Sequence, residues 1–189
     1  MKLYVDFDGV IVNTIEAIVH LYNEDFKYYR NFKYILPEQI KTWDFIECSC
    51  ASREYINTYF NQQRLFDKLN FMPGAYNILK KFALSNEVII VSSGFSPNLK
   101  AKEQWIKKYL PFCDFIGVNL KKYSDKSHID MSGEGNIFID DSANNLITSN
   151  CENKICFGDI YTWNEEWKGK RCWDWNMIYL KFKSDLERR

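Results

Sequence analysis

Short apolar runs alternate with longer amphipathic stretches along the chain, and this alternation predicts the elements of the fold. Apolar runs of strand length occur at residues 3–6, 87–94, 112–120, 136–141 and 154–160. Stretches with helical spacing or helix-starting residues occur at residues 13–29, 73–83, 96–109, 141–149 and 173–188. The continuous run EVIIVSSG is typical of a strand buried on both faces, as in a parallel sheet.

The stretch between the first two strands is too long for a simple crossover connection. Residues 13–29 are predicted to form a helix that Asn13 caps, and residues 30–69 are aromatic and expected to be mostly helical. One helix is expected to start near Pro37 and another to cover residues 53–66. Strands and helices alternate from residue 71 onwards. We therefore predict an α/β fold: a Rossmann-like three-layer parallel sheet with a small helical cap inserted after the first strand.

The expected domains are a core formed by residues 1–12 and 71–189 and a cap formed by residues 13–70. A chain of 189 residues suits one domain with an insertion, and 46% hydrophobic and 17% aromatic residues indicate a folded globule. Lys plus Arg and Asp plus Glu both number 25, so no overall charge would recruit nucleic acid or an acidic membrane.

No apolar stretch has the length that a bilayer requires, and acidic residues interrupt the first apolar run, so neither a membrane span nor a signal peptide is expected. The spacings of the six cysteines, CSC and CENKIC among them, match no zinc site. We expect reduced thiols and a cytoplasmic protein. The sequence leaves open whether the protein forms a homodimer.

Two pairs of acidic residues follow buried strands. Asp6 and Asp8 lie two apart after the first strand, so their side chains are expected to face one pocket, and Gly9 allows a tight turn there. Asp140 and Asp141 end a later strand. In open parallel sheets ligands bind beyond the carboxyl ends of the strands. Carboxylates brought together there would repel one another and suit Mg²⁺.

Two further groups fall where a phosphate would bind. Ser92 and Ser93 close the strand VIIV, where hydroxyl and backbone N–H groups can hold phosphate oxygens. Lys126 precedes the strand of Asp140 and would bring positive charge to a phosphoryl group. Each feature alone is common in ordinary turns and surfaces. Their combination, each at a strand end and in this chain order, is much more specific.

The segments DFDGV, VIIVSSG, Lys126 and FIDD resemble the four motifs of the haloacid dehalogenase (HAD) superfamily, over nearly the whole chain. Within it the chain resembles the 5'(3')-deoxyribonucleotidases. The local features that carry this resemblance are WDF at residues 43–45, PGA at 73–75, KEQWIKKY at 102–109, SDKS around Lys126, FIDDS at 138–142 and the tail KRCWDWNMI.

The resemblance implies an Mg²⁺-dependent phosphomonoesterase for nucleoside monophosphates, with deoxyribonucleotides preferred. In that family pattern Asp6 is the nucleophile that forms an aspartyl-phosphate, and Asp8 is the general acid and base. Asp6, the backbone carbonyl of Asp8 and Asp140 would hold Mg²⁺, with Asp141 supporting them.

The resemblance also implies the groups that hold the substrate. Ser92 and Lys126 would bind the phosphoryl oxygens, and Ser93 and Lys102 resemble further phosphate contacts. Trp43 and Phe45 would stack on the base or pack inside the cap, and the sequence alone does not decide between the two. The segment GFSPN after Ser93 and the CSC segment depart from the family pattern.

Two alternatives remain open from the sequence. A sugar-phosphate phosphatase or phosphomutase of the same superfamily can share the first motif, although this chain lacks a GKPxPD segment around its lysine. A phosphorylatable receiver module also combines Asp, Ser, Lys and Mg²⁺ at strand ends. Its chain order differs, however, and it has no long insertion after the first strand.

Overall fold

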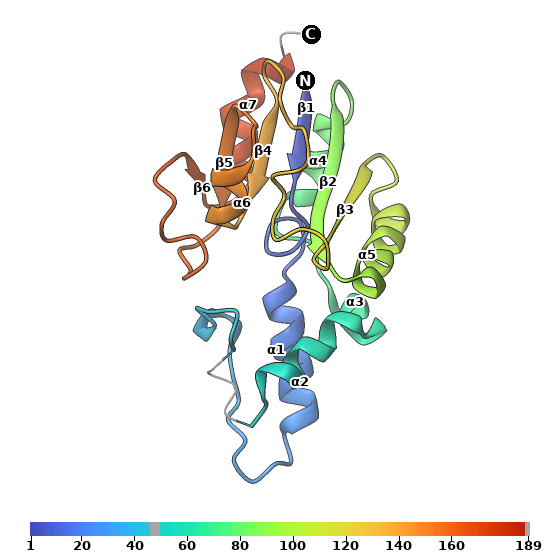
Figure 1. Cartoon of the computed structure of the whole chain (residues 1–189), viewed down its shortest axis with the longest axis vertical. Coiled ribbons are helices and arrows are strands. Elements are labelled where there is room, and N and C mark those ends of the chain that lie inside the picture. The colour runs from blue at the N-terminus through green and yellow to red at the C-terminus, as the bar shows by residue number, and fades with distance from the viewer. Residues whose placement is uncertain (46–49, 188–189) are drawn as a thin grey trace.

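A computed structural model describes residues 1–45 and 50–187 of the chain. Its centre is a sheet of six parallel strands in the order β3-β2-β1-β4-β5-β6 (Figure 1). The strands are β1 (Lys2–Val5), β2 (Glu87–Gly94), β3 (Asp114–Asn119), β4 (Ile137–Asp140), β5 (Asn153–Phe157) and β6 (Arg171–Cys172). The parallel sheet predicted from the sequence is confirmed, with β6 as an additional strand.

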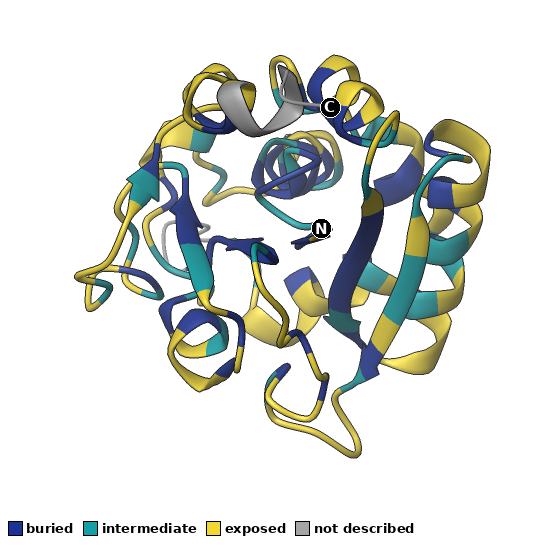
Figure 2. Ribbon diagram, turned by 90° about the horizontal axis from the view of Figure 1, so that it is seen from above, coloured by how far each residue is buried: buried dark blue, intermediate teal, exposed yellow. Residues whose placement is uncertain are grey.

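Successive side chains of each strand enter opposite layers of core. In β1, Leu3 and Val5 belong to the larger hydrophobic cluster, whereas Tyr4 belongs to the smaller one on the other face. The central strands β1, β2 and β4 are therefore mostly dark blue in Figure 2, whereas β3 at the edge is mostly teal and yellow. This burial on both faces explains why the strands read as continuous apolar runs.

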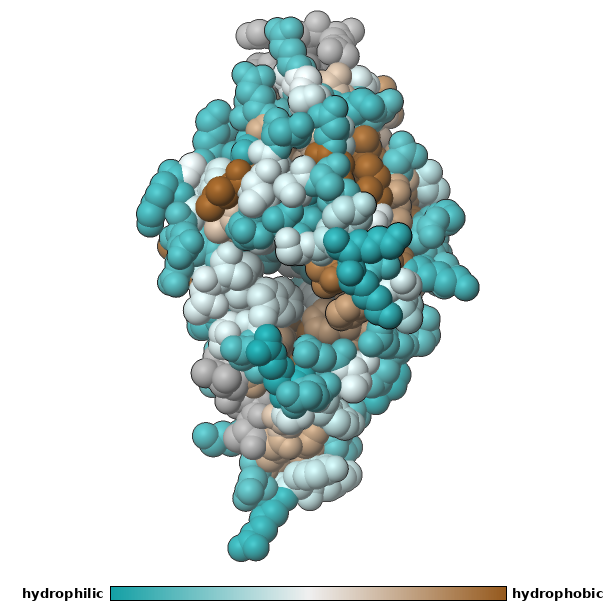
Figure 3. All heavy atoms as spheres, in the orientation of Figure 1, coloured by the Kyte–Doolittle hydropathy of each residue, from teal (hydrophilic) through white to brown (hydrophobic). Residues whose placement is uncertain are grey.

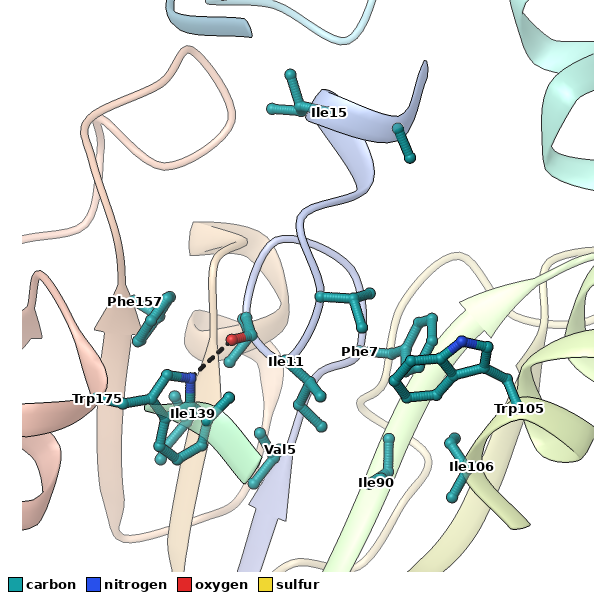
Figure 4. Close-up of a cluster of buried hydrophobic side chains, with 14 of the residues drawn as sticks. Val5, Phe7, Ile11, Ile15, Ile90, Trp105, Ile106, Ile139, Phe157 and Trp175 are labelled. Carbon is teal, nitrogen blue, oxygen red and sulfur yellow. Dashed lines mark hydrogen bonds between the residues drawn. The ribbon is translucent and has the colours of Figure 1, made fainter. Parts of the chain in front are cut away.

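Helices cover both faces of the sheet and make the fold three-layered. The helices α4 (Ala75–Phe82), α5 (Ser96–Tyr109) and α7 (Trp175–Glu187) contribute to the larger cluster, and α6 (Ala143–Thr148) to the smaller one. In Figure 4, Trp175 lies against Phe157 and its indole N–H donates to the backbone carbonyl of Val10 at 2.8 Å. This bond ties α7 to the turn that follows β1.

The segment between β1 and α4 lies beyond the carboxyl ends of the strands (Figure 1). It contains α1 (Thr14–Phe26), the short 3₁₀ turns η1 (Pro37–Gln39) and η2 (Tyr59–Asn61), α2 (Arg53–Thr58) and α3 (Gln63–Lys68). We refer to residues 13–70 as the inserted segment. Asn13 caps α1 as predicted, accepting from the backbone N–H of Glu16 at 3.2 Å.

The expectation of a mostly helical stretch over residues 30–69 is wrong. Its buried side chains at Ile35, Ile40 and Phe45 are spaced by five residues, so they cannot share one helix face. The side chain of Asn23 pairs instead with the backbone of Ile35, accepting at 3.0 Å and donating at 2.8 Å. The one helix predicted over residues 53–66 is interrupted at Gln62, which is extended.

Three smaller expectations can also be compared with the structure. The helix predicted to reach residue 29 ends at Phe26, because Tyr28 and Tyr29 are exposed and offer nothing to bury. Five cysteines are free thiols, and Cys48 of the CSC segment lies outside the described residues. Across residues 1–45 and 50–187, helices long and apolar enough for a membrane span are absent.

The strand order places a crevice at one point of the sheet. After β1 the chain adds β2 and β3 on one side, and β4, β5 and β6 on the other. The order therefore reverses beside β1 and β4, and such a reversal opens a binding crevice at the carboxyl ends of the strands. Side chains that follow β1 and β4 consequently meet in one place.

Candidate active site

Three buried carboxylates converge at this crevice. Asp6 follows β1 directly, Asp140 is the last residue of β4, and Asp141 comes next. A backbone hydrogen bond from Asp6 N–H to the carbonyl of Ile139, at 2.9 Å, keeps the two strand ends together. One carboxylate oxygen from each of the three acids lies within 4.8 Å of the others, and all three residues are at most 8% exposed.

Lys126 lies among these acids, as its position before β4 predicted. Its ammonium group is 1% exposed and donates to Asp6 Oδ1 at 2.5 Å and to Asp140 Oδ2 at 2.6 Å. Within the described residues, Lys126 is the cation that forms ion pairs with this cluster. Three carboxylates facing one ammonium group leave two negative charges uncompensated when all are ionised.

The unbalanced charge is visible in the pKa values. Burial raises the pKa of Asp6 to about 7; the attraction of Lys126 opposes this rise, and repulsion from Asp140 and Asp8 adds to it. Burial also raises the pKa of Asp141 well above its usual range, with repulsion from Asp6 and Asp140. For Lys126, burial acts to lower the pKa, but the two acids outweigh burial and the net change is a rise.

These acids are held by partners that the sequence analysis did not identify. Asp140 accepts from the backbone N–H of Ser142 at 2.8 Å and from the amide of Asn145 at 3.2 Å. Asp141 accepts from the indole N–H of Trp163 at 2.9 Å. The position of Asn145 in the first turn after a strand-ending acid pair offered a signal for its role. Trp163 lies in a loop far along the chain and offered none.

Asp8 is not part of this carboxylate cluster and pairs with a second lysine, Lys102. Its carboxylate accepts from Thr14 Oγ1 at 2.7 Å and forms an ion pair with Lys102, which is 2% exposed. The Lys102 ammonium group also donates to Ser92 Oγ at 2.9 Å and to the backbone carbonyl of Ser93 at 3.0 Å. The structure thus brings Asp8 and Lys102 together with both serines, and adds Thr14, which the sequence analysis missed.

Gly9 packs against the acid cluster rather than standing free beside it. Its backbone has φ +71°, a conformation that residues other than glycine rarely adopt. A β-carbon at this position would lie 2.7 Å from Asp141 Oδ2. The glycine therefore lets the turn after β1 approach the Asp141 carboxylate closely.

A cavity of about 440 Å³ opens next to Asp8 and Lys102, between the sheet and the inserted segment. Figure 3 shows a hollow in this face at the same level of the molecule. The inserted segment lines it with Glu54, Asn57, Thr58, Phe60 and Asn61, and the core lines it with Asp8, Ser93, Gly94, Phe95, Asn98, Lys102 and Leu120. Its volume and its mixed apolar and polar lining suit a small-molecule ligand.

Trp43 and Phe45 do not line this cavity. Phe45 is 2% exposed and packs inside the inserted segment, with φ +48°. Trp43 is half-buried, and its ring centroid lies 4.9 Å from that of Trp163 and 6.4 Å from that of Phe60. Stacking of either residue on a base stays a prediction, and Phe60 is the aromatic side chain of the inserted segment that reaches the cavity.

The donor set fits a hard divalent cation. Carboxylate oxygens are the ligands that Mg²⁺ prefers, and Asp6, Asp140 and Asp141 present them within one small volume. A divalent cation would also balance the two negative charges that Lys126 leaves uncompensated. Asp6 and Asp140, two of the ligands expected from the sequence, therefore fit a Mg²⁺ site, with Asp141 as the third nearby carboxylate.

The fold is the one found in solved structures of haloacid dehalogenase hydrolases. Solved structures with the same fold include a HAD-superfamily hydrolase of subfamily IA from Geobacter sulfurreducens, with TM-score 0.60, 12% identity and coverage of 95% of each chain. The magnesium-bound HAD-hydrolase YfnB of Bacillus subtilis matches with TM-score 0.61 and 14% identity, over 96% of this chain and 98% of that one.

Residues 1–182 match the family described as 5' nucleotidase, deoxy (pyrimidine), cytosolic type C protein (NT5C), and the chain belongs to this family. A 5'(3')-deoxyribonucleotidase of Bacillus subtilis is 27% identical over 152 residues, which cover 75% of this chain and 76% of the relative. The protein is therefore a phosphoric monoester hydrolase, and the resemblance inferred from the sequence motifs is confirmed.

Replacing Gly9 by alanine tests the close approach to Asp141. We expect Gly9→Ala to lower the free energy of unfolding by about 2 kcal/mol, because the β-carbon must displace a buried carboxylate in addition to straining the backbone. Gly135→Ala is the matched control: its φ is +76° but the nearest atom to a β-carbon is 4.0 Å away. It should lose only about 1 kcal/mol. Equal losses for the two variants in urea unfolding would contradict the packing described.

Proposed function

We propose that the protein is an Mg²⁺-dependent 5'-nucleotidase of the cytoplasm, acting on nucleoside monophosphates and preferring deoxyribonucleotides. The observation that carries this proposal is the convergence of Asp6, Asp140 and Asp141 near Lys126, together with a cavity of about 440 Å³ that Asp8 and Lys102 line. Family membership and the deoxyribonucleotidase relative support the choice of substrate class.

In this proposal Asp6, Asp140 and the backbone carbonyl of Asp8 hold the Mg²⁺, and Asp141 supports them. The bound ion would supply charge that stabilises the phosphoryl oxygens and keeps Asp6 ionised. The Lys126 ammonium group lies within hydrogen-bond distance of Asp6 and Asp140. It would contribute positive charge to the phosphoryl group that Asp6 attacks.

Asp6 is the proposed nucleophile. Its carboxylate oxygen would attack phosphorus, and the bond from phosphorus to the nucleoside oxygen would break, leaving an aspartyl-phosphate. Asp6 suits this role because Oδ1 is held by Lys126. A fixed carboxylate loses little entropy when it reaches the attacking geometry.

Asp8 is the proposed general acid and base. Once a substrate phosphate shares the Lys102 ammonium group, Asp8 would be protonated, and it would donate that proton to the departing nucleoside oxygen in the first step. In the second step it would take a proton from water, whose oxygen attacks phosphorus and releases inorganic phosphate and the Asp6 carboxylate. Asp8 borders the cavity and is oriented by Thr14 and Lys102.

The remaining phosphate contacts come from the end of β2. Ser92 and Ser93 would bind phosphoryl oxygens through hydroxyl and backbone N–H groups, and Lys102 would add charge. In the structure the Lys102 ammonium group pairs with the Asp8 carboxylate and donates hydrogen bonds to Ser92 Oγ and to the backbone carbonyl of Ser93. A phosphoryl oxygen of the substrate bound among these groups would also accept a hydrogen bond from the Lys102 ammonium group.

The inserted segment, residues 13–70, is proposed to act as a cap that closes the cavity over the nucleoside. The bond from Asn98 Nδ2 to the carbonyl of Phe60, at 2.7 Å, connects the core to this segment at the cavity wall. Phe60 offers an aromatic face for a base, which is a partner of low sequence preference. Trp43 and Phe45 remain alternative base contacts, as the sequence resemblance implies.

A sugar-phosphate phosphatase or phosphomutase of the same superfamily is the second candidate. It would use the residues of the same four sequence motifs, and it would differ in the substrate that occupies the cavity. The aromatic and amide side chains contributed by Phe60, Asn57 and Asn61 favour a nucleoside over a bare sugar. The alternative of a non-enzymatic receiver module is wrong, because the chain belongs to a family of nucleotidases.

The proposal is tested by measuring phosphate release from a panel of nucleoside monophosphates and sugar phosphates, with and without Mg²⁺. We expect turnover only with Mg²⁺ and fastest with deoxyribonucleoside monophosphates. Asp6→Asn should reduce turnover by at least about a thousandfold, because no nucleophile remains. It should not lower the free energy of unfolding, because it removes one of three mutually repelling buried charges.

Asp8→Asn serves as the companion variant. It should also abolish turnover, but it leaves the buried Lys102 ammonium group without its ion-pair partner and should lower the free energy of unfolding by about 3 kcal/mol. Wild-type rates in the Asp6 variant would refute the nucleophile assignment. Preference for a sugar phosphate would move the protein to the second candidate.

Replacing Phe60 by alanine tests the base site. We expect KM for a deoxyribonucleoside monophosphate to rise about tenfold, because stacking on a base contributes about 1–3 kcal/mol. KM for glycerol phosphate, which has no base, should stay within twofold. Trp43→Ala is measured alongside, and a larger selective rise in that variant would assign base stacking to Trp43 instead.

A further inference from the structure

The loop between β5 and β6, residues 158–170, reaches across to the inserted segment (Figure 1). The backbone N–H and the hydroxyl of Thr162 both donate to the carbonyl of Lys41, each at 3.2 Å. The ring of Trp43 lies against Trp163, with 4.9 Å between centroids. The loop therefore contacts residues 41–43 through its backbone and through an aromatic pair.

The same loop is rigidly built. Asn164 is fully buried, accepts from the backbone N–H of Tyr161 at 3.0 Å and donates to the carbonyl of Asp159 at 3.0 Å. Arg171 donates to the carbonyl of Asn164 at 2.9 Å. The ring of Tyr161 stacks on Trp163, at 4.3 Å and an angle of 3°. One face of the Trp163 indole thus packs on a fixed support.

Trp163 also contacts the segment from Asp141 to Ala143, which follows β4, at two points. Its indole N–H donates to Asp141 Oδ2 at 2.9 Å, and its backbone carbonyl accepts from Ala143 N–H at 3.1 Å. Asp141 is 8% exposed, and Gly9 lies against the same oxygen. The indole is consequently a fixed donor to a carboxylate that has little room to turn.

We propose that Trp163 is a positioning residue that couples the seating of residues 41–43 to the orientation of the Asp141 carboxylate. Trp43 and Tyr161 hold the indole between them, and the indole N–H holds the carboxylate. Displacing Trp43 would remove one of the two aromatic contacts of the ring, and the donor to Asp141 would be less well directed. The coupling rests on the proposed function only in that Asp141 supports the Mg²⁺ ligands.

The coupling has a chemical consequence for the site. Residues that support metal ligands typically change metal affinity by 10- to 100-fold when they are removed, and Trp163 acts on such a residue, so we expect an effect at the lower end of this range. Because residues 41–43 belong to the inserted segment, the site would bind Mg²⁺ most tightly when that segment is seated on the loop. The protein would thereby link closure over the substrate to completion of the metal site.

The test measures the Kd of Mg²⁺ by titration calorimetry on the full chain, without substrate. Trp163→Phe keeps the ring against Trp43 and Tyr161 but removes the N–H, and we expect the Kd to rise about tenfold. Trp167→Phe is the matched control, since its indole N–H donates to the carbonyl of Lys170 at 2.9 Å in the same loop. Its Kd should equal that of the wild type.

Trp43→Ala separates the coupling from a simple hydrogen bond. Alone it should raise the Kd of Mg²⁺ about threefold, although it leaves the N–H in place. In the Trp163→Phe background it should have no further effect, because its influence passes through that N–H. Additive effects of the two substitutions, equal Kd in Trp163→Phe and Trp167→Phe, or a wild type without Mg²⁺ binding would each overturn the coupling.

Calorimetry needs no turnover, so this result is independent of the substrate assignment. A chain that binds Mg²⁺ with the expected pattern but releases no phosphate from any monoester would support the coupling and refute the proposed function. Near-ultraviolet circular dichroism on each variant establishes that the fold is retained, and Trp43→Ala supplies a second route if Trp163→Phe is not folded.

Discussion

Three carboxylates buried around a single ammonium group are the constraint on which the rest of the site depends. Asp6, Asp140 and Asp141 are removed from water, where ionised carboxylates are costly, and Lys126 balances only one of the charges. The raised pKa values of Asp6 and Asp141 express this imbalance. A divalent cation is the simplest addition that would resolve it, and the same cation would stabilise the charge of a phosphoryl group.

The strand order of the sheet brings these charged side chains together. The sheet order reverses beside β1 and β4, so the carboxyl ends of these strands meet at one crevice. Both strands are buried on their two faces, which fixes their ends against the hydrophobic layers. The inserted segment and the β5–β6 loop then enclose the crevice from outside, with Trp163 joining them to Asp141.

Much of this could be predicted from the sequence, because strands buried on both faces have clear apolar runs and Asp6 and Asp140 follow them directly. The features that were not predicted have no local signal in the sequence. Ile35 and Ile40 contact the core at a spacing that no regular element produces, and β6 has only two residues. Trp163 acquires its partner through tertiary packing alone, so its role could not be predicted from its neighbours in the chain.

The most direct test of the central claim is to locate the cation itself. Anomalous diffraction from crystals grown with Mn²⁺, which shares the oxygen preference of Mg²⁺, would place the ion without reference to activity. If Asp6 and Asp140 share one cation, a single strong peak lies about 2.2 Å from their carboxylate oxygens. A peak elsewhere, or none at the crevice while Lys126 still bridges the two acids, would contradict it.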